Sequence, residues 1–233
     1  MRHDSHPQPI GIVIPLALLT GLTGCMTAPK QSQPPPPIAA IENLTAGGGF
    51  HVRVPEFVAH PEPSRFSICY GNTCAKRATV SLSSEEWRQV RLLFAPAAPV
   101  AAQERAAIAH AVALLEQIVG TKTGTHQDLP MDVPGFGKPG QLDCIDEATN
   151  TTVYLTLLYN DALLRWHTVG GRATRGPFTG LVTSWPHSTS VVRDISSGEQ
   201  YAVDSWFLAN GEPPYIVPMS VWWSGWRPDA APP

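Results

Sequence analysis

The sequence predicts an α+β domain, in which helices come first along the chain and pack on an antiparallel sheet that follows. The clearest helix runs from Ala101 to Val119, where apolar residues recur at helical spacing and Gly120 follows as an end signal. Its apolar stripe consists of Ile108, Val112, Leu115 and Val119. From about residue 180 onward, strand-like segments rich in β-branched and aromatic residues replace this pattern. They are Leu181–Trp185, His187–Asp194 and Glu199–Phe207.

Two more helices are expected. Ser83, Ser84 and the acidic residues after them predict an N-capped helix that runs to about Phe94. Another is expected from Cys144 to about Tyr159, because Asp143 is a good N-cap and acidic residues occupy the first turn. The β-branched residues in its middle favour a strand instead, so both assignments stay open. The tail is expected to be a loop whose tryptophans line the core or a cleft: Trp222, Trp223 and Trp226.

The first residues are expected to be a targeting segment. Ile10–Gly24 is apolar but too short to span a bilayer comfortably. It leads into Leu-Thr-Gly-Cys at residues 22–25, which resembles the lipobox of bacterial lipoproteins. The resemblance implies cleavage before Cys25, whose thiol then carries diacylglycerol. An ordinary signal peptide or a short anchor is the alternative. In a Gram-negative cell, Met26 in place of Asp implies an outer-membrane anchor facing the periplasm.

These patterns divide the chain into three segments. Residues 1–24 are the expected signal peptide, residues 25–49 a lipidated Cys and a Pro/Gly-rich linker, and residues 50–233 one domain. Removing 24 of 233 residues leaves 209, enough for a well-packed domain. The net charge is −3 and the basic residues are scattered, so no nucleic acid is expected as a partner. The lipid anchor makes the membrane an expected partner.

Cysteine usage separates one thiol from the others. Cys69 and Cys74 stand around a turn-forming Gly-Asn, between strand-like runs at 66–68 and 78–80. In an oxidising compartment they would most simply form a hairpin disulfide. A metal-binding pair is the alternative, although no second Cys or His pair follows at zinc spacing. Cys144 is then left unpaired, and a free thiol in an exported protein is a candidate for catalysis.

The expected helix start would favour ionisation of Cys144. If Asp143 is the cap, Cys144 occupies the first helical position, where the helix dipole and free N–H groups favour the thiolate. The same N–H groups could stabilise an oxyanion on an attacked acyl carbon. The competing interpretation is a structural cysteine, because free cysteines are among the most buried residues.

A predicted hairpin supplies two partners for this thiol. A tight turn at Ser196-Ser197 would pair Asp194 with Glu199, which places His187 and Asp204 on one face as diagonal neighbours. A register slip of one residue would place them on opposite faces, and a surface His with a solvated Asp is the alternative. His167, in a region that looks like a loop, competes as the base but has no carboxylate at hairpin spacing.

These residues resemble the transglutaminase-like cysteine proteinases of the papain-like and transglutaminase-like group. Asp-Cys-Ile-Asp-Glu-Ala at residues 143–148 is similar to the family's Asp-Cys-x-Asp-x-Ala motif, and His187 and Asp204 follow in the family's order. The resemblance covers roughly residues 101–207. It implies a transglutaminase-like fold, with Cys144 as nucleophile, His187 as general base and later acid, and Asp204 as the carboxylate that orients the His.

The resemblance also bears on cofactors. Some periplasmic relatives bind calcium through acidic residues beside the Cys, but Ile145 occupies a position that is acidic in those relatives. No cofactor is therefore expected, and calcium is doubtful. The oxyanion-hole side chain is not assigned by the motif, and Gln141 is a guess for it.

Three hypotheses for function follow. The leading one is an envelope lipoprotein whose Cys144–His187–Asp204 triad hydrolyses or transfers peptide or other amide acyl groups through a thioester, with a protein or peptide as substrate. The second is a catalytically inactive relative that serves as an envelope binding module. The third is a cell-wall amide hydrolase, which differs from the first only in its substrate.

Overall fold

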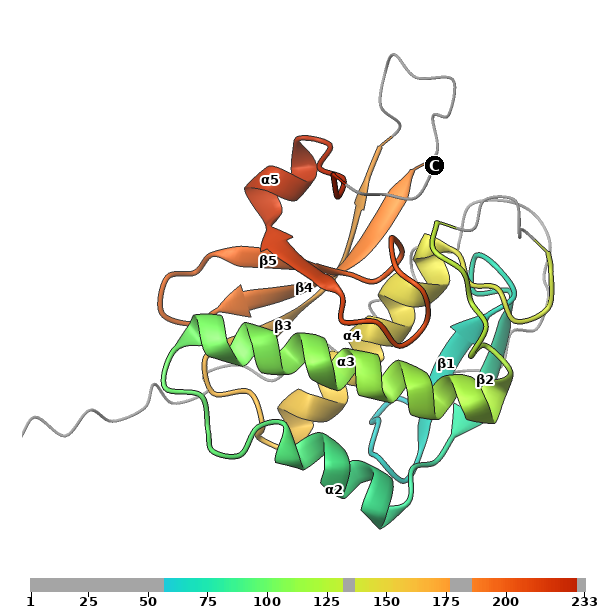
Figure 1. The fold of residues 1–233 in the computed structure, drawn as a ribbon, viewed down its shortest axis with the longest axis horizontal. Helices are drawn as coiled ribbons and strands as arrows, with labels where there is room; N and C mark the ends of the chain where they lie inside the picture. Colours follow the sequence, from blue (N-terminus) through green and yellow to red (C-terminus); the bar gives the residue numbers. More distant parts are fainter. Residues whose placement is uncertain (1–56, 132–136, 177–185, 230–233) are drawn as a thin grey trace, which may run out of the picture. The chain divides into compact units, whose positions relative to one another are not determined.

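The described part of the chain contains four helices and two antiparallel sheets. The computed structural model describes residues 57–131, 137–176 and 186–229, which all belong to one unit of the chain, 31–233. The predicted α+β class is confirmed at this level (Figure 1). The expected signal peptide, lipidated Cys25, linker and strand at 181–185 lie outside the described residues. Among the described helices, none has the length and apolar character needed to cross a membrane.

The first sheet is the expected hairpin. Strand β1 (Phe66–Tyr70) pairs antiparallel with β2 (Lys76–Val80), two residues longer than predicted at the turn end of each strand. The connection is tight because residues 71–74 all have positive φ, between 53° and 84°. Only one of these four is a glycine, Gly71, so the other three adopt the left-handed conformation at a cost that the surrounding contacts must offset.

Two helices follow the hairpin. Helix α2 (Ser84–Leu92) begins as predicted, with a capping box between Ser83 and Glu86. Helix α3 (Ala101–Thr123) buries its whole predicted apolar stripe: Ile108, Val112, Leu115 and Val119. The expected end at Gly120 is wrong, because the helix continues to Gly124, which has φ 79°. Gly120 instead permits close approach, since a Cβ there would lie 3.0 Å from the backbone of His126.

Helix α4 (Cys144–Asn160) lies at the centre of the fold, in contact with β1, α3 and the second sheet (Figure 1). The predicted helix is confirmed to within one residue, and the strand alternative is wrong. The β-branched residues fit because three threonine hydroxyls donate to the carbonyl four residues earlier in the helix. They are Thr149, Thr152 and Thr156. Thr152 also bonds Ser190 of the sheet, at 3.0 Å.

The second sheet has the order β3–β4–β5–β6. Its strands are β3 (His167–Arg175), β4 (His187–Asp194), β5 (Gln200–Asp204) and β6 (Tyr215–Pro218). Strand β4 has the predicted bounds and β5 lies inside its predicted segment. The loop expected around His167 is wrong: this residue opens β3, where Gly170, Gly171 and a bulge after Val169 obscure the alternation that marks a strand.

The expected loop at the chain's tail is also wrong. Residues 215–218 form β6, and α5 (Met219–Trp223) follows directly. Both elements are too short to show a clear periodicity, and Pro218 lies at their junction. The consequence is that Trp222, on α5, lies fully buried beside the sheet.

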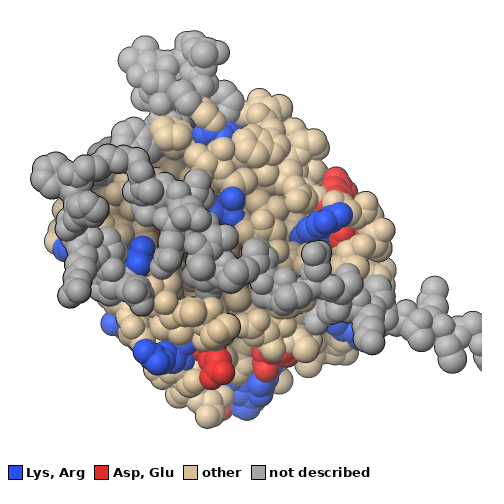
Figure 2. Space-filling view, turned by 180° about the vertical axis from the view of Figure 1, so that it is seen from behind, with Lys and Arg blue, Asp and Glu red and all other residues tan. Residues whose placement is uncertain are grey.

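Charge is distributed without large single-sign areas on the face drawn in Figure 2. There, basic and acidic residues of the described chain occur as separate groups or in mixed pairs. Ion pairs at the surface of the described chain include Arg88–Glu85 and Arg91–Asp161. Such pairs contribute little to stability, so the fold depends on its buried contacts.

Candidate active site

The start of α4 is built around the Asp143 side chain. Its Oδ1 accepts hydrogen bonds from the N–H groups of Ile145 and Asp146, at 3.0 and 2.9 Å, which confirms the predicted N-cap. Cys144 therefore occupies the first helical position. The cap also takes up two of the N–H groups that were expected to be free for an oxyanion. The N–H of Cys144 itself is the helix-start donor that the cap does not use.

The predicted hairpin register is confirmed. Ser190 pairs with Val203 and Arg193 pairs with Gln200, the alignment expected from a tight turn at Ser196-Ser197. His187 and Asp204 therefore share a face, and His187 Nε2 lies 2.7 Å from Asp204 Oδ2. Both residues are buried, with 6% and 1% of their surfaces exposed. A hydrogen bond between such groups in a low-dielectric surrounding fixes the orientation of the ring strongly.

The other ring nitrogen of His187 has no hydrogen-bond partner among the described residues. This nitrogen, Nδ1, is buried. Aromatic rings surround the imidazole, with ring centroids at 4.9 Å (Trp206), 5.2 Å (Phe207) and 5.7 Å (Trp222). Since Asp204 engages Nε2, the neutral ring carries its proton there and presents the lone pair of Nδ1. This tautomer follows from the hydrogen bond.

The sulfur of Cys144 lies against the backbone on both sides of His187. The thiol donates to the carbonyl of Pro186 at 3.7 Å, and the N–H of Ser188 donates to the sulfur. The structure thus brings all three predicted residues to one place at the start of α4 and the adjoining ends of β4 and β5. No hydrogen bond joins Cys144 to the His187 ring in this arrangement.

The electrostatic surroundings oppose ionisation of the thiol. Only 2% of Cys144 is exposed, and burial raises the pKa of its thiol to about 12, with Asp143 and Asp204 acting in the same direction. The Ser188 N–H and the charge of Arg172 act against this rise. The expectation that the helix start lowers the pKa is therefore wrong: desolvation outweighs the helix dipole here.

Comparisons with protein-family models, curated proteins and solved structures found no match for this chain. The resemblance to transglutaminase-like cysteine proteinases stays a prediction that rests on residues 143–148, His187 and Asp204. The geometry is informative without any family assignment, because a His–carboxylate pair near a free thiol is an arrangement that can support nucleophilic catalysis.

Trp222 is a site residue that the sequence did not reveal. Its indole Nε1 donates to Asp204 Oδ2 at 2.8 Å, so one carboxylate oxygen receives both this bond and that of His187. Arg175 on β3 holds the tryptophan in place: its guanidinium donates to the carbonyls of Trp222 and Trp226 and lies 4.4 Å from the Trp222 ring centroid. Clustered tryptophans were the signal, but no spacing linked them to Asp204.

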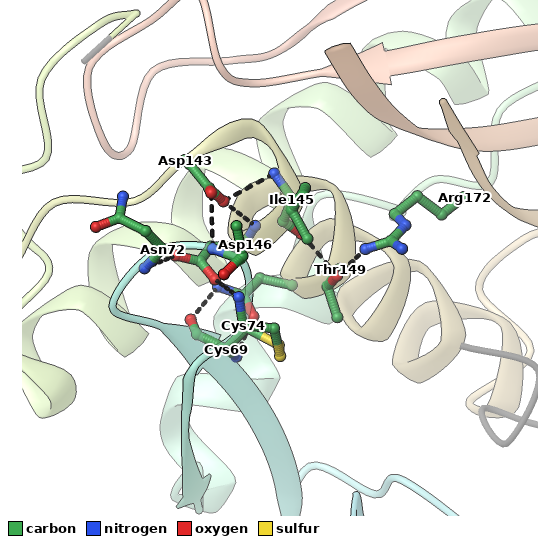
Figure 3. The surroundings of a disulfide bond; sticks show 10 residues. Cys69, Asn72, Cys74, Asp143, Ile145, Asp146, Thr149 and Arg172 are labelled. Atoms are coloured by element: carbon green, nitrogen blue, oxygen red, sulfur yellow. Dashed lines mark hydrogen bonds between the residues drawn. A yellow bond between two sulfur atoms is a disulfide. The ribbon is translucent and has the colours of Figure 1, made fainter. Parts of the chain in front are cut away.

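The acidic residues beside Cys144 bind the disulfide loop (Figure 3). Asp146 accepts from the N–H groups of Asn72 and Cys74, at 2.8 and 2.7 Å, and Asp143 Oδ2 accepts from Thr73 N–H at 2.7 Å. Burial, followed by the charge of Asp143, raises the pKa of Asp146 to about 7. These carboxylate oxygens thus accept hydrogen bonds from backbone N–H groups of the disulfide loop.

The disulfide itself is confirmed. Cys69 and Cys74 are bonded, which leaves Cys144 as the free cysteine among the described residues. Cys69, Cys74 and Asp146 also have potential metal-ligand atoms close together. Because the two sulfurs are joined to each other, they are not thiolate ligands in this state, and the metal-pair alternative does not describe it.

Two other predicted candidates have different roles. The side chain of Gln141 accepts from Leu129 N–H at 3.1 Å and donates to the carbonyl of Gln127 at 3.0 Å, and its role in an oxyanion hole stays a prediction. His167 is fully buried, with Nδ1 2.9 Å from Glu104 Oε1. Its carboxylate partner comes from α3, which hairpin spacing could not indicate.

A second buried carboxyl group, that of Glu147, lies close to Asp204. Glu147 and Asp204 line the same small pocket, and one carboxylate oxygen of each has no hydrogen-bond partner among the described residues. Burial raises the pKa of Glu147 well above its usual range, and Asp128 and Glu116 raise it further. When it holds its proton, Glu147 adds no negative charge next to Asp204.

Proposed function

We propose that this protein is a cysteine-dependent enzyme of amide acyl transfer, most simply a peptide-bond hydrolase that acts through a thioester. The observation that carries the proposal is the His187–Asp204 hydrogen bond, which leaves Nδ1 of the ring without a partner, while the free thiol of Cys144 contacts the backbone on both sides of His187. A nucleophile, a base and a group that orients the base are the parts this chemistry requires.

The proposed reaction has two halves. Cys144 transfers its thiol proton to His187 Nδ1, and the sulfur attacks the amide carbon, which forms a tetrahedral oxyanion. Collapse breaks the C–N bond, and the imidazolium returns the proton to the leaving nitrogen, which leaves a thioester on Cys144. Water, deprotonated by the same ring, attacks the thioester and releases the acid and the thiol. Asp204 stabilises the imidazolium in both halves through its bond to Nε2.

The pKa of Cys144 shows how much the imidazolium must contribute. A thiol whose pKa is about 12 would need roughly 7 kcal/mol to ionise alone at pH 7. Proton transfer to His187 replaces that isolated anion by a thiolate–imidazolium pair, in which each charge stabilises the other at short range. Removing the ring therefore has a larger effect on this thiol than on an exposed one.

The test is alkylation of Cys144 by iodoacetamide across pH 5 to 9. We expect labelling to persist below pH 7 and to fall by roughly tenfold or more in His187→Ala, because the base that accepts the proton is gone. His110→Ala, which removes an exposed histidine on α3, is the matched control and should label like the wild type. Slow labelling at the same rate in the wild type and His187→Ala would reject the proposal.

A second candidate function is a binding module of the cell envelope without catalysis. The observation in its favour is the burial of Cys144 and the raised pKa of its thiol, which fit a structural cysteine. This candidate expects slow labelling that is independent of His187, together with binding to an envelope partner that is unchanged in Cys144→Ala.

The proposed address and substrate rest on the sequence. We propose that Cys25 is lipidated and that the domain faces the periplasm from the outer membrane, with a protein or peptide substrate and no cofactor. A cell-wall amide would use the same chemistry. Incubation of the purified protein with peptidoglycan and with folded periplasmic proteins, followed by detection of new amino groups, separates the two substrates.

A further inference from the structure

Arg172 is a half-buried guanidinium that has no ion pair within the described residues. Its Nη1 donates to Thr149 Oγ1 at 3.0 Å, as Figure 3 shows. Its Nε is buried and has no hydrogen-bond partner there. Burial lowers the pKa of Arg172, while the nearby Cys144, Asp143 and Asp146 act in the opposite direction.

The position of Arg172 is set by β3 and by the first turns of α4. On β3 it pairs with Ser190 of β4, the strand that carries His187. The Thr149 hydroxyl, which accepts a hydrogen bond from Arg172 Nη1, in turn donates to the carbonyl of Ile145 at 2.6 Å. The guanidinium is therefore tied to the helix that begins with Cys144, and its charge acts on that thiol.

The nearby carboxylates are already engaged by other donors. Asp143 caps α4 and accepts from Thr73, while Asp146 accepts from two N–H groups of the disulfide loop. Arg175 lies three residues further along β3, and its guanidinium donates to the carbonyls of Trp222 and Trp226. Arg172 differs, because the Nη1 bond to Thr149 leaves the edge formed by Nε and Nη2, which is the fork that matches a carboxylate.

We propose that this edge of Arg172 is a subsite for a carboxylate beside Cys144. The acyl donors of the proposed reaction would then carry a carboxylate close to the scissile amide, as at a free C-terminus or an acidic side chain. The substrate class rests on the proposed function, whereas anion binding at Arg172 does not require turnover.

The test compares two alkylating reagents of similar size, the anion iodoacetate and the neutral iodoacetamide, at pH 7 and constant ionic strength. We expect the ratio of their rates at Cys144 to be roughly tenfold higher in the wild type than in Arg172→Gln, because only the wild type draws the carboxylate to the thiol. Arg172→Lys should give an intermediate ratio, since it keeps the charge without the fork. Arg88→Gln, an exposed arginine of α2, should match the wild type.

A second measurement uses the wild-type protein alone. In the wild type, acetate should slow labelling by iodoacetate, whereas acetamide at the same concentration should not. Equal reagent ratios in the wild type and Arg172→Gln would overturn the subsite. If that variant does not fold, equal effects of acetate and acetamide on the wild type would overturn it. A preference for iodoacetate that survives in His187→Ala, with labelling rates equal to those of the wild type, would support the subsite while rejecting the proposed catalysis. No labelling by either reagent would overturn both.

Discussion

Replacing Trp222 by Phe tests whether the indole N–H positions Asp204. Trp222 is fully buried, and its Nε1 lies 2.8 Å from the carboxylate oxygen that also receives His187. Phenylalanine keeps an aromatic ring in place but removes the donor. The variant therefore leaves Asp204 with the single bond from His187, because its other oxygen has no hydrogen-bond partner among the described residues.

The size of the effect follows from two contributions. A hydrogen bond to a charged group contributes about 1.5–3 kcal/mol to stability. The smaller ring also leaves a cavity, which adds roughly 1 kcal/mol. We expect Trp222→Phe to lower the free energy of unfolding by about 2.5–4 kcal/mol. Trp223→Phe is the matched control, because the neighbouring tryptophan is 50% exposed and its loss should cost about 0.5 kcal/mol or less.

The assay is urea unfolding followed by circular dichroism at pH 7, in the wild type and in Asp204→Asn. The amide still accepts a hydrogen bond, but a neutral one that contributes only about 0.5–1.5 kcal/mol. The cost of Trp222→Phe should therefore shrink by roughly 1 kcal/mol in that background. Equal costs for Trp222→Phe and Trp223→Phe, or an unchanged cost in Asp204→Asn, would refute this role.

Two further predictions concern stability. Burial raises the pKa of Glu116 to about 7, so the folded state binds its proton more tightly and loses stability as pH rises from about 4.5 to about 7. Glu116→Gln keeps acceptor and donor groups for Ser205 and Gly211. Its free energy of unfolding should therefore exceed that of the wild type by at most about 3 kcal/mol at pH 8, and by much less at pH 4. Thermal midpoints that differ from the wild type's by the same amount at pH 4 and pH 8 would contradict this. Changing Cys69 and Cys74 together to Ser should cost about 2 kcal/mol, the amount expected for so short a loop, and dithiothreitol should lower the wild type's midpoint but not the variant's.

Features that the sequence predicted correctly depend on residues close together in the chain. Ser83 and Asp143 each cap a helix through N–H groups two or three residues away. The register of β4 and β5 is set by their turn, where Asp194 accepts from the N–H groups of Ser196 and Ser197. A correct register was sufficient to place His187 on the same face as Asp204, and the structure adds the 2.7 Å bond.

The features that the sequence missed depend on long-range packing. Strand β3 is interrupted by Gly170 and Gly171, and it becomes a strand because it pairs along β4. Trp222 meets Asp204 across 18 positions of the chain, through an α5 that only the surrounding contacts specify. No local pattern encodes such pairs, since the partners of each residue are chosen by how the elements pack.

By itself, the sequence determined the α+β class, the start of α4 at Cys144, the Cys69–Cys74 disulfide and the shared face of His187 and Asp204, because caps, turns and strand alternation are local. Only the tertiary structure decided the surroundings of those groups. It buries Cys144, which raises the pKa of its thiol against the effect of the helix dipole, and it places Arg172 where its charge acts on that thiol. Desolvation and charge act through space, and their balance is therefore fixed only when the whole fold has assembled.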